Sequence, residues 1–233
     1  MNIALVLSGG AGSRMGIGVP KQYLEVKGRK IITYVLDVLM RHKDIDAVQI
    51  VAANEFREEI SDQIDIYIPE FKDKLAGFSE PGEIRQLSIV TALVDISGYA
   101  PEEAHVLIHD AARPCITADI ISRCIEALKD HEGVMPVLPV KDAVYKSKDG
   151  STVYDLLNKS EVYTGQAPEG FILGKYLKAN WKLLPTDIYK VNGAADPAVL
   201  AGMDVVMIPG DEKNFSIITK EDFDRFRELV RKG

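Results

Sequence analysis

Short continuous runs of apolar residues alternate along the chain with stretches whose apolar residues recur every three or four positions. The continuous runs occupy residues 3–7, 48–53, 106–108, 134–140 and 205–208, and each is typical of a strand in a sheet. Helical spacing is found at residues 31–42, 55–74 with a break at Pro69, 84–94, 117–128, 197–202 and 220–232. This order of strands and helices predicts an α/β fold with a doubly wound, mostly parallel sheet.

Local signals refine the ends and faces of these elements. Asn54 and Thr117 are expected to cap the helices that follow them, because their side chains can accept a hydrogen bond from a backbone N–H group. The helix at 84–94 is expected to bury one face made of Ile84, Leu87, Thr91 and Val94. Pro136 and Pro139 are expected to place their strand at a sheet edge or a bend, since proline cannot donate a ladder hydrogen bond.

Residues 141–165 depart from this rhythm. Two runs rich in β-forming residues, 143–146 and 152–154, flank the tripeptide Lys148-Asp149-Gly150, and Asp-Gly between such runs is a strong hairpin signal. A lone hairpin has too little core to be stable by itself, so we expect this β-hairpin arm to pack on a partner surface. The alternative is a solvated surface flap.

Composition and charge narrow the class of protein. The chain has 233 residues, 46% of them hydrophobic and 27% charged, which suits a single domain spanning residues 1–233. The formal net charge of −7 argues against a general nucleic-acid-binding surface. The sequence shows neither a signal peptide nor an apolar run long enough for a membrane span, so a cytoplasmic protein is expected. Cys115 and Cys124 lack metal-ligand spacing and are expected to be reduced packing residues.

The first chemically informative stretch is residues 8–22, which directly follows the first apolar run. Its opening, Ser8-Gly9-Gly10-Ala11-Gly12, predicts a tight turn with bare backbone N–H groups that can bind anions. Arg14 and Lys21 add two cations, and together these features suit a nucleoside triphosphate. The P-loop pattern is absent, and the dinucleotide pattern fails because Met15 stands where its third glycine belongs. An ordinary glycine-rich turn is the alternative for the glycines alone.

Polar residues directly follow the predicted strand at 106–108, at the carboxyl end where α/β sheets bind ligands. Asp110 is the candidate ligand for Mg²⁺, a hard cation that prefers oxygen. His109 is expected to be a packed or hydrogen-bonded histidine, without a catalytic role. Arg113 lies three residues on and can reach a second anionic group.

The string G-G-x-G-x-R-M-x-x-x-x-P-K-Q at 9–22 and the hexapeptide HDAARP at 109–114 carry a family resemblance. They resemble signature segments of the cytidylyltransferases that make CDP-methylerythritol and CDP-ribitol, enzymes of isoprenoid and teichoic acid synthesis. The resemblance covers nearly the whole chain. It implies a Rossmann-like nucleotidyltransferase fold, CTP as the nucleotide, Mg²⁺ as cofactor, a small phosphorylated polyol as acceptor, and a homodimer clasped by the 141–165 arm.

Roles for individual residues follow from this resemblance. Arg14 and Lys21 would stabilise charge on the triphosphate, whereas Arg113 and Lys159 would bind the acceptor's phosphate. The residues expected to bind the nucleotide are Ser8, Gly9, Gly10, Ala11, Gly12, Gly82, Glu83, Ser88, Ala111, Lys213 and Ser216. Among them, Gly82 and Ser88 belong to a G-x-x-R-x-x-S segment whose Arg85 is either a ligand contact or a structural ion-pair partner.

Several family positions are altered in this chain. Residues 158–169 are similar to the segment [DN]-R-x-x-[LV]-[WY]-x-x-Q-T-P-Q, but Lys159 replaces its arginine and Ala167 its threonine. Ala143 likewise stands where threonine is usual, and residues 194–196 resemble T-D-[ED] without the threonine. Ser216 occupies the lysine position of N-x-K-[IV]-T. Lys213 is a possible replacement, although three residues along a strand would point to the opposite face.

The losses gather on the acceptor side, and missing hydroxyl contacts can change the preferred alcohol. We therefore expect transfer of CMP from CTP to an alditol phosphate such as D-ribitol 5-phosphate. The alternatives are 2-C-methyl-D-erythritol 4-phosphate, another sugar phosphate or a phosphonate as acceptor, and a nucleotide-binding protein that has lost turnover. A nicotinamide dehydrogenase is a more distant possibility.

Overall fold

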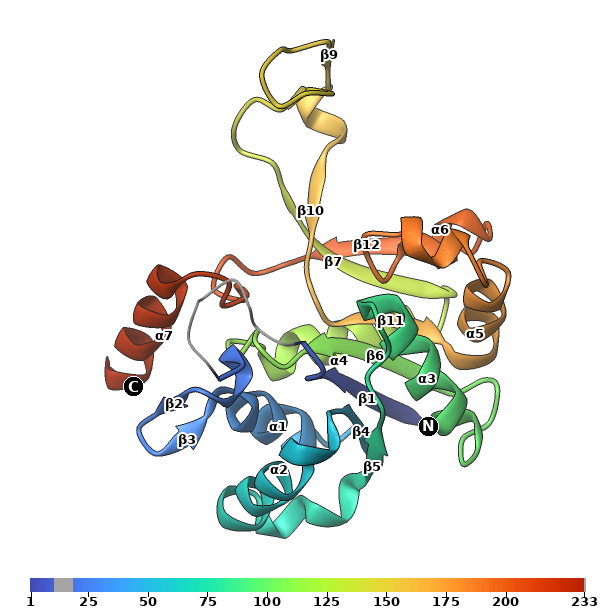
Figure 1. Ribbon diagram of the computed structural model, residues 1–233. Helices are drawn as coiled ribbons and strands as arrows, with labels where there is room; N and C mark the ends of the chain where they lie inside the picture. Colours follow the sequence, from blue (N-terminus) through green and yellow to red (C-terminus); the bar gives the residue numbers. More distant parts are fainter. Residues whose placement is uncertain (11–18, 233) are drawn as a thin grey trace.

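A single mixed sheet forms the centre of the computed structural model, which describes residues 1–10 and 19–232 (Figure 1). Within these residues the sheet has eight strands. They are β1 (Asn2–Leu7), β4 (Ala47–Val51), β5 (Leu75–Ser79), β6 (His105–Asp110), β7 (Gly133–Pro139), β10 (Tyr163–Gly165), β11 (Glu169–Ile172) and β12 (Val205–Pro209). This confirms the predicted α/β class.

The strand order explains how the two halves of the sheet meet. β5, β4, β1 and β6 lie side by side and run parallel, followed by β11, which is antiparallel to β6. β10 and β11 both pair with β7, one after the other, and β12 pairs with β7 in parallel. Thus, among the strands described, β10 and β11 run antiparallel to the other six.

Helices cover both faces of the sheet because its central strands are apolar on both sides (Figure 1). In β1, Ala4 and Val6 pack with α1 (Ile31–Arg41), α2 (Asn54–Tyr67) and α4 (Ala118–Ala127). Ile3 and Leu5 face the opposite side, where they pack with α3 (Arg85–Ser97), α5 (Leu173–Trp181) and α6 (Asp196–Leu200). The alternating side chains of β1 therefore pack into two different hydrophobic cores, one on each face of the sheet.

A third, smaller core holds the C-terminal helix against the N-terminal half. α7 (Lys220–Lys232) packs through Phe226 on α1 and on the hairpin of β2 (Glu25–Val26) and β3 (Arg29–Lys30). Phe226 meets the ring of Tyr34 edge to face, with the ring centroids 5.1 Å apart. The remaining short helices are η2 (Lys21–Tyr23), η3 (Pro69–Lys74), η4 (Lys159–Glu161) and η5 (Asp187–Lys190).

Two local expectations about helices are wrong, and one is confirmed. The face predicted for α3 is incorrect: Val94 is 46% exposed, while Ile89, Leu93 and Ile96 are fully buried. The reason is that these three residues form a more continuous apolar stripe facing the sheet. Asn54 is the first residue of α2 and makes no capping hydrogen bond, since the N-cap is Ala53. Thr117 does cap α4, accepting from the Ile120 N–H group at 3.4 Å.

The prolines do not place β7 at a sheet edge. β7 has β12 on one side and the β10–β11 line on the other. Pro136 falls between Val134, which pairs with β11, and Val137, which pairs with β10. Its missing N–H group therefore lies where the ladder changes partner, so it removes no central hydrogen bond.

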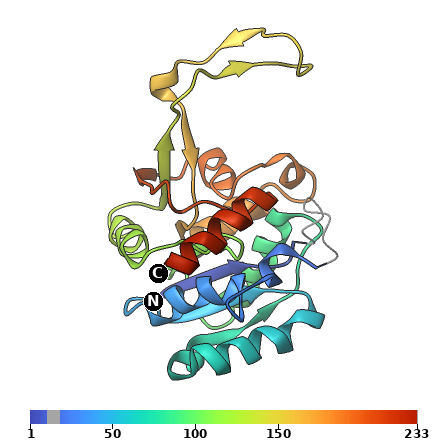
Figure 2. The ribbon, with the colours of Figure 1, turned by 90° about the vertical axis from the view of Figure 1, so that its left-hand side faces the viewer.

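The predicted arm is confirmed as a protrusion beyond the sheet (Figures 1 and 2). It leaves at the end of β7 and returns through β10. Its hairpin consists of β8 (Tyr145–Lys146) and β9 (Asp155–Leu156), so the second strand starts later than the sequence suggested. Gly150 at the turn has a φ of +73°, which favours glycine.

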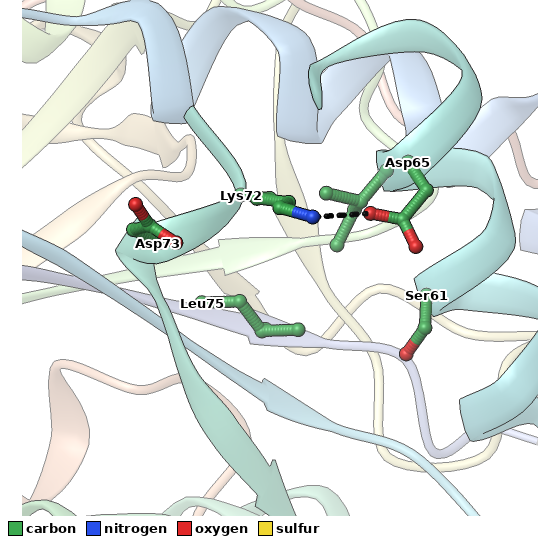
Figure 3. Close-up of a pocket in the computed structure, with 6 residues that line it drawn as sticks. Ser61, Asp65, Lys72, Asp73 and Leu75 are labelled. Carbon is green, nitrogen blue, oxygen red and sulfur yellow. Dashed lines mark ion pairs between the residues drawn. The ribbon is translucent and has the colours of Figure 1, made fainter. Parts of the chain in front are cut away.

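A pocket of about 260 Å³ lies between α2, η3 and β5 (Figure 3). Its lining includes Asp65 and Lys72, whose charged groups are 3.7 Å apart, and Leu75, the first residue of β5. The pocket is therefore at the amino end of a parallel strand, opposite to the end where such sheets bind ligands. Within the described ranges, no helix combines the length and apolar character needed to cross a membrane.

Candidate active site at the carboxyl ends of the strands

The glycine segment after β1 is held by close contacts to the neighbouring strands. A Cβ atom on Gly9 would lie 2.6 Å from Cβ of Pro81, so only glycine fits there. At Gly10 no atom of the described residues, which exclude 11–18, comes within 4 Å of a Cβ atom. Ser8 is buried, and its hydroxyl is 2.8 Å from that of Tyr23. Ser8 thus stabilises the start of the loop by an internal hydrogen bond, whereas Gly10 is exposed.

Gln22 fixes the backbone of this segment. Its buried amide donates to the carbonyl of Ser8 at 2.7 Å and to that of Gly10 at 2.9 Å. The amide thereby ties η2, which carries Lys21, to the loop that follows β1. The sequence motif contained Gln22 but gave it no role, although a buried glutamine must find hydrogen-bond partners.

If this loop binds the nucleotide CTP, as the sequence predicts, replacing Gln22 with leucine is expected to raise the KM for it about tenfold. The Gly10 carbonyl would lose the Gln22 donor and the Ser8 carbonyl would keep only the 3.3 Å bond from the Tyr23 hydroxyl, and a lost hydrogen bond costs roughly 1–3 kcal/mol. Steady-state pyrophosphate release measures this change. Gln49→Leu is the matched control, since the buried Gln49 amide bonds instead to Ser79 inside the sheet. Both variants should lower the melting temperature, but only Gln22→Leu should alter the KM. Equal KM values would contradict the role of Gln22.

Lys21 lies at the first position of η2. The turn is closed by the Tyr23 N–H group donating to the Pro20 carbonyl at 2.9 Å, and that of Leu24 donating to the Lys21 carbonyl at 3.2 Å. Lys21 is therefore placed beside the loop by a rigid backbone. Three other predicted residues, Ala11, Gly12 and Arg14, lie outside the described residues.

Gly82 and Ser88 meet at the start of α3. The Gly82 N–H group donates to the Ser88 hydroxyl at 2.9 Å, and a Cβ atom on Gly82 would lie 2.8 Å from the Ser88 nitrogen. Glu83, between them in the chain, accepts a hydrogen bond from the Tyr189 hydroxyl at 3.0 Å. These contacts shape the turn between β5 and α3. Their predicted nucleotide contacts remain predictions.

Asp110 ends β6 between two arginines. Arg85 donates to one carboxylate oxygen at 3.1 Å, and the Arg113 Nε atom is 3.9 Å from the other. Burial favours the neutral acid, but the two guanidinium groups outweigh it and hold the pKa of Asp110 below its ordinary value. Asp110 is therefore an ionised carboxylate. Of the two roles considered for Arg85, the ion-pair role is the one observed here.

His109 and Ala111 flank Asp110 and are internal. The His109 Nε2 atom is 3.0 Å from the Arg113 carbonyl, so this nitrogen carries the proton. Burial lowers the pKa of His109 to about 4, which leaves the ring neutral. The Ala111 N–H group donates to the Leu7 carbonyl at 3.0 Å and joins the end of β6 to that of β1. His109 is thus hydrogen-bonded, as expected.

The segment that follows β12 folds back over this end of the sheet. Arg113 donates to the Asn214 carbonyl at 2.6 Å, and the Gln166 amide donates to the same oxygen at 3.1 Å. Lys213 lies on a turn and is exposed, so the argument that it points to the opposite face of a strand from Ser216 does not apply. Ser216 is half-buried nearby in the chain. Neither residue has a demonstrated ligand contact.

Lys159 lies on the arm and not at the carboxyl ends of the strands. It lies in η4 on the arm, where it is exposed and its ammonium group donates to the Lys141 carbonyl. In contrast, β6, the strand that ends at Asp110, lies in the sheet below the arm (Figure 1). The predicted contact of Lys159 with the acceptor's phosphate therefore remains a prediction.

The donor set at Asp110 fits Mg²⁺ only when a ligand supplies further oxygens. Across residues 1–10 and 19–232 no group of three or more metal-ligating side chains is found. Nucleotide-dependent proteins commonly bind Mg²⁺ through one or two carboxylates together with phosphate oxygens. One ionised aspartate beside the glycine loop is consistent with that arrangement.

Glu169 is a buried acid that the sequence analysis did not single out. It is the first residue of β11, is 9% exposed, and lies opposite Ile108 of β6. Burial raises its pKa to about 7, although the charge of Arg85 opposes this shift. The signal was present in the sequence: the family segment quoted above ends in glutamine, and this chain has an acid at that position.

Comparison with known proteins agrees with this geometry. The sequence profile described as "IspD: 2-C-methyl-D-erythritol 4-phosphate cytidylyltransferase" matches residues 2–232. The chain is 30% identical to a ribitol-5-phosphate cytidylyltransferase of Streptococcus agalactiae, over 98% of this chain and 95% of that protein. It is 35% identical to a 2-C-methyl-D-erythritol 4-phosphate cytidylyltransferase of Neorickettsia sennetsu, over 91% and 90% respectively.

A solved structure shows the same fold. The 4-diphosphocytidyl-2C-methyl-D-erythritol synthase of Anaerococcus prevotii superposes with a TM-score of 0.82 at 24% identity, over 99% of this chain and 96% of that one. The likeness therefore includes the arm as well as the sheet.

Proposed function

Since the chain belongs to the 2-C-methyl-D-erythritol 4-phosphate cytidylyltransferase family, we propose that this cytidylyltransferase uses CTP and an alditol phosphate, with D-ribitol 5-phosphate preferred. The reaction would form a CDP-alditol and pyrophosphate. The observation that most supports the site is the ionised Asp110, which lies between Arg85 and Arg113 at the same end of the sheet as the glycine loop.

In the proposed reaction an oxygen of the acceptor's phosphate attacks the α-phosphorus of CTP in line, and pyrophosphate leaves. A phosphate monoester is already anionic at neutral pH, so no side chain has to remove a proton. Positioning and charge stabilisation then account for catalysis. The N–H groups of the loop at Gly9 and Gly10 would cradle the triphosphate, and Lys21 and Arg14 would neutralise its charge.

On the acceptor side, Arg113 keeps hydrogen-bonding capacity although its Nε atom is ion-paired with Asp110. Its Nε atom is buried and lacks a hydrogen-bond partner among the described residues, while another of its nitrogens is bound by the Asn214 carbonyl. A phosphate oxygen is a suitable partner for such a donor. Lys159 would add a second cation from the arm of another subunit. When bound, Mg²⁺ would neutralise triphosphate charge, and Asp110 is the residue proposed to hold it.

The acceptor preference rests on positions where the chain departs from the methylerythritol-type pattern. Ala143 and Ala167 remove two hydroxyl groups from the acceptor side. Gly165 resembles the ribitol branch, and a Cβ atom there would lie 2.8 Å from the flexible Met135 side chain, which would have to move. 2-C-Methyl-D-erythritol 4-phosphate is the second candidate, favoured by the relative from Neorickettsia sennetsu.

The test is pyrophosphate release by pure protein with CTP, Mg²⁺ and a panel of acceptors. The panel contains D-ribitol 5-phosphate, 2-C-methyl-D-erythritol 4-phosphate, another sugar phosphate and a phosphonate. We expect kcat/KM for D-ribitol 5-phosphate to exceed the others at least about tenfold, the scale set by one or two lost hydroxyl contacts. A larger value for 2-C-methyl-D-erythritol 4-phosphate would overturn the acceptor assignment. Lys213→Ala in the same assay tests whether Lys213 replaces the lysine missing at Ser216.

The arm supports a homodimer as the functional unit. Its apolar side chains are solvent-exposed in the monomer, with Tyr154 at 53%, Val153 at 62% and Leu156 at 69%. Its two strands have two residues each, too few to be stable without a partner surface. A second copy of the chain would cover these side chains and place Lys159 near the other subunit's acceptor.

Sedimentation velocity at micromolar concentration is expected to show a dimer. Tyr154→Asp combined with Leu156→Asp should shift the protein toward monomer, because each carboxylate would lie in the proposed apolar interface. Ile66→Asp is the matched control, since Ile66 is 64% exposed on α2, away from the arm. A monomeric wild-type protein would exclude the dimer.

A further inference from the structure

Glu169 lies on the same face of the sheet as the candidate active site. Directly opposed residues of antiparallel strands share a face, and Glu169 opposes Ile108. Asp110 is two residues beyond Ile108 on β6, so its side chain also points to this face. Ile108 packs in the core formed with α3 and α5, and α3 begins at Arg85. β11 thus brings a second carboxylate to the side of the sheet occupied by Asp110 and Arg85.

The carboxylate of Glu169 retains acceptor sites for further hydrogen bonds. The Ala195 N–H group, just before α6, is near enough to favour the charged form of this carboxylate. The charges of Arg85 and Arg113 both act on Glu169, yet no ion pair within 4.0 Å joins Glu169 to either arginine. A carboxylate has about four acceptor sites, so the Ala195 contact leaves capacity for further donors. An acid at such a buried position is retained when a partner compensates it.

The residues next to Glu169 and Ala195 in the sequence indicate which kind of ligand group suits the Glu169 carboxylate. Glu169 follows Ala167-Pro168, and Ala195 follows Ala194, so both segments have methyl groups where the family patterns contain a polar residue. These positions no longer offer hydroxyl or carboxylate groups to a ligand. The Asp196 carboxylate accepts from the backbone N–H groups of Asn192 and Gly193, at 2.7 and 3.1 Å, whereas Glu169 keeps acceptor capacity for a ligand. Hydroxyl groups are the donors a carboxylate binds most strongly among neutral groups.

We propose that Glu169 determines acceptor specificity by accepting hydrogen bonds from hydroxyl groups of a polyol phosphate whose phosphate lies against Arg113. The inference rests on the proposed function. Ala195 would hold one carboxylate oxygen, leaving the other for the acceptor. The identity of the polyol is not needed for this role: any acceptor with hydroxyl groups near its phosphate would use Glu169, whereas one without them would not.

The experiment compares two acceptors in wild-type protein and in Glu169→Gln at pH 8, above the pKa of about 7, so that Glu169 is mostly ionised. One acceptor is the polyol phosphate that the wild type uses best, and the other is ethyl phosphate, which keeps the phosphate but has no hydroxyl group on its carbon chain. The amide can still accept from Ala195, so the fold is preserved, and a melting curve checks this. Glu132→Gln is the control, because the Glu132 carboxylate bonds to Lys175 on the surface.

We expect Glu169→Gln to lower kcat/KM for the polyol phosphate about 10- to 100-fold, the scale for loss of a charged hydrogen bond. The slow reaction with ethyl phosphate and the KM for CTP should change less than threefold. An equal decrease for both acceptors, or none for either, would overturn the specificity role. If the wild-type protein releases no pyrophosphate with any polyol phosphate, the proposed function is overturned instead. This result needs only the wild-type protein, so it is distinguishable from loss of the specificity role.

Discussion

Replacing Asp110 with asparagine is expected to lower kcat about 10³-fold while leaving the fold intact. The substitution preserves shape but removes the one ionised oxygen ligand proposed for Mg²⁺, and it leaves Arg85 and Arg113 without their shared counter-charge. Loss of a preorganised charge at a reacting phosphate commonly costs 10²- to 10³-fold, and loss of the metal adds to it. Single-turnover pyrophosphate release measures the effect.

Two further measurements separate the roles of Asp110. If the carboxylate binds Mg²⁺, the variant should need a higher Mg²⁺ concentration for half-maximal rate. If it serves only to neutralise the arginines, this concentration should stay unchanged. Asp204→Asn is the matched control, since Asp204 is an exposed acid paired with His131 far along the sheet. A kcat within threefold of wild type would exclude Asp110 from catalysis.

The second large effect is expected for Lys21→Met, which should reduce kcat/KM for CTP about 10²- to 10³-fold. Methionine keeps most of the length and apolar volume of lysine but removes the ammonium group that would neutralise triphosphate charge. The turn that carries residue 21 is closed by backbone hydrogen bonds, so it should persist in the variant. Initial rates at varied CTP give the ratio.

Lys21→Arg is the control that retains the positive charge. It should recover part of the lost rate, because the guanidinium is larger and disperses its charge over a plane. Activity of Lys21→Met at one third of wild type or more would show that the lysine is not required. Calorimetric titration with CTP then distinguishes weaker binding from slower chemistry.

The fold was predictable because its signal is carried by long periodic segments. The apolar runs at β1, β4, β6 and β12 and the Asp149-Gly150 turn each specify local structure without tertiary contacts. What failed depends on neighbours that periodicity does not reveal. Pro136 suggested a sheet edge or a bend because proline lacks a donor. The edge is excluded, since the position at which β7 changes partner makes that donor unnecessary.

The site was predictable where one motif lies on one strand end, and less so where distant segments meet. HDAARP located Asp110 and Arg113 correctly at the end of β6. Glu169 was missed because its importance comes from register: the antiparallel pairing of β11 with β6 brings it beside residues that precede it by about sixty positions. Gln22 was missed because its partners are backbone carbonyls, which leave no trace in the sequence.

The arm is inserted between two strands that remain hydrogen-bonded neighbours, β7 and β10. The ladder from Val137 to Pro139 holds the base of the insertion closed, so its outer part can lengthen, shorten or be exchanged without shifting the register of the sheet. The nucleotide loop and Asp110, in contrast, are built into the ends of β1 and β6. Such an arrangement is modular: changes to the arm would alter the proposed subunit pairing and leave the ends of β1 and β6 unchanged.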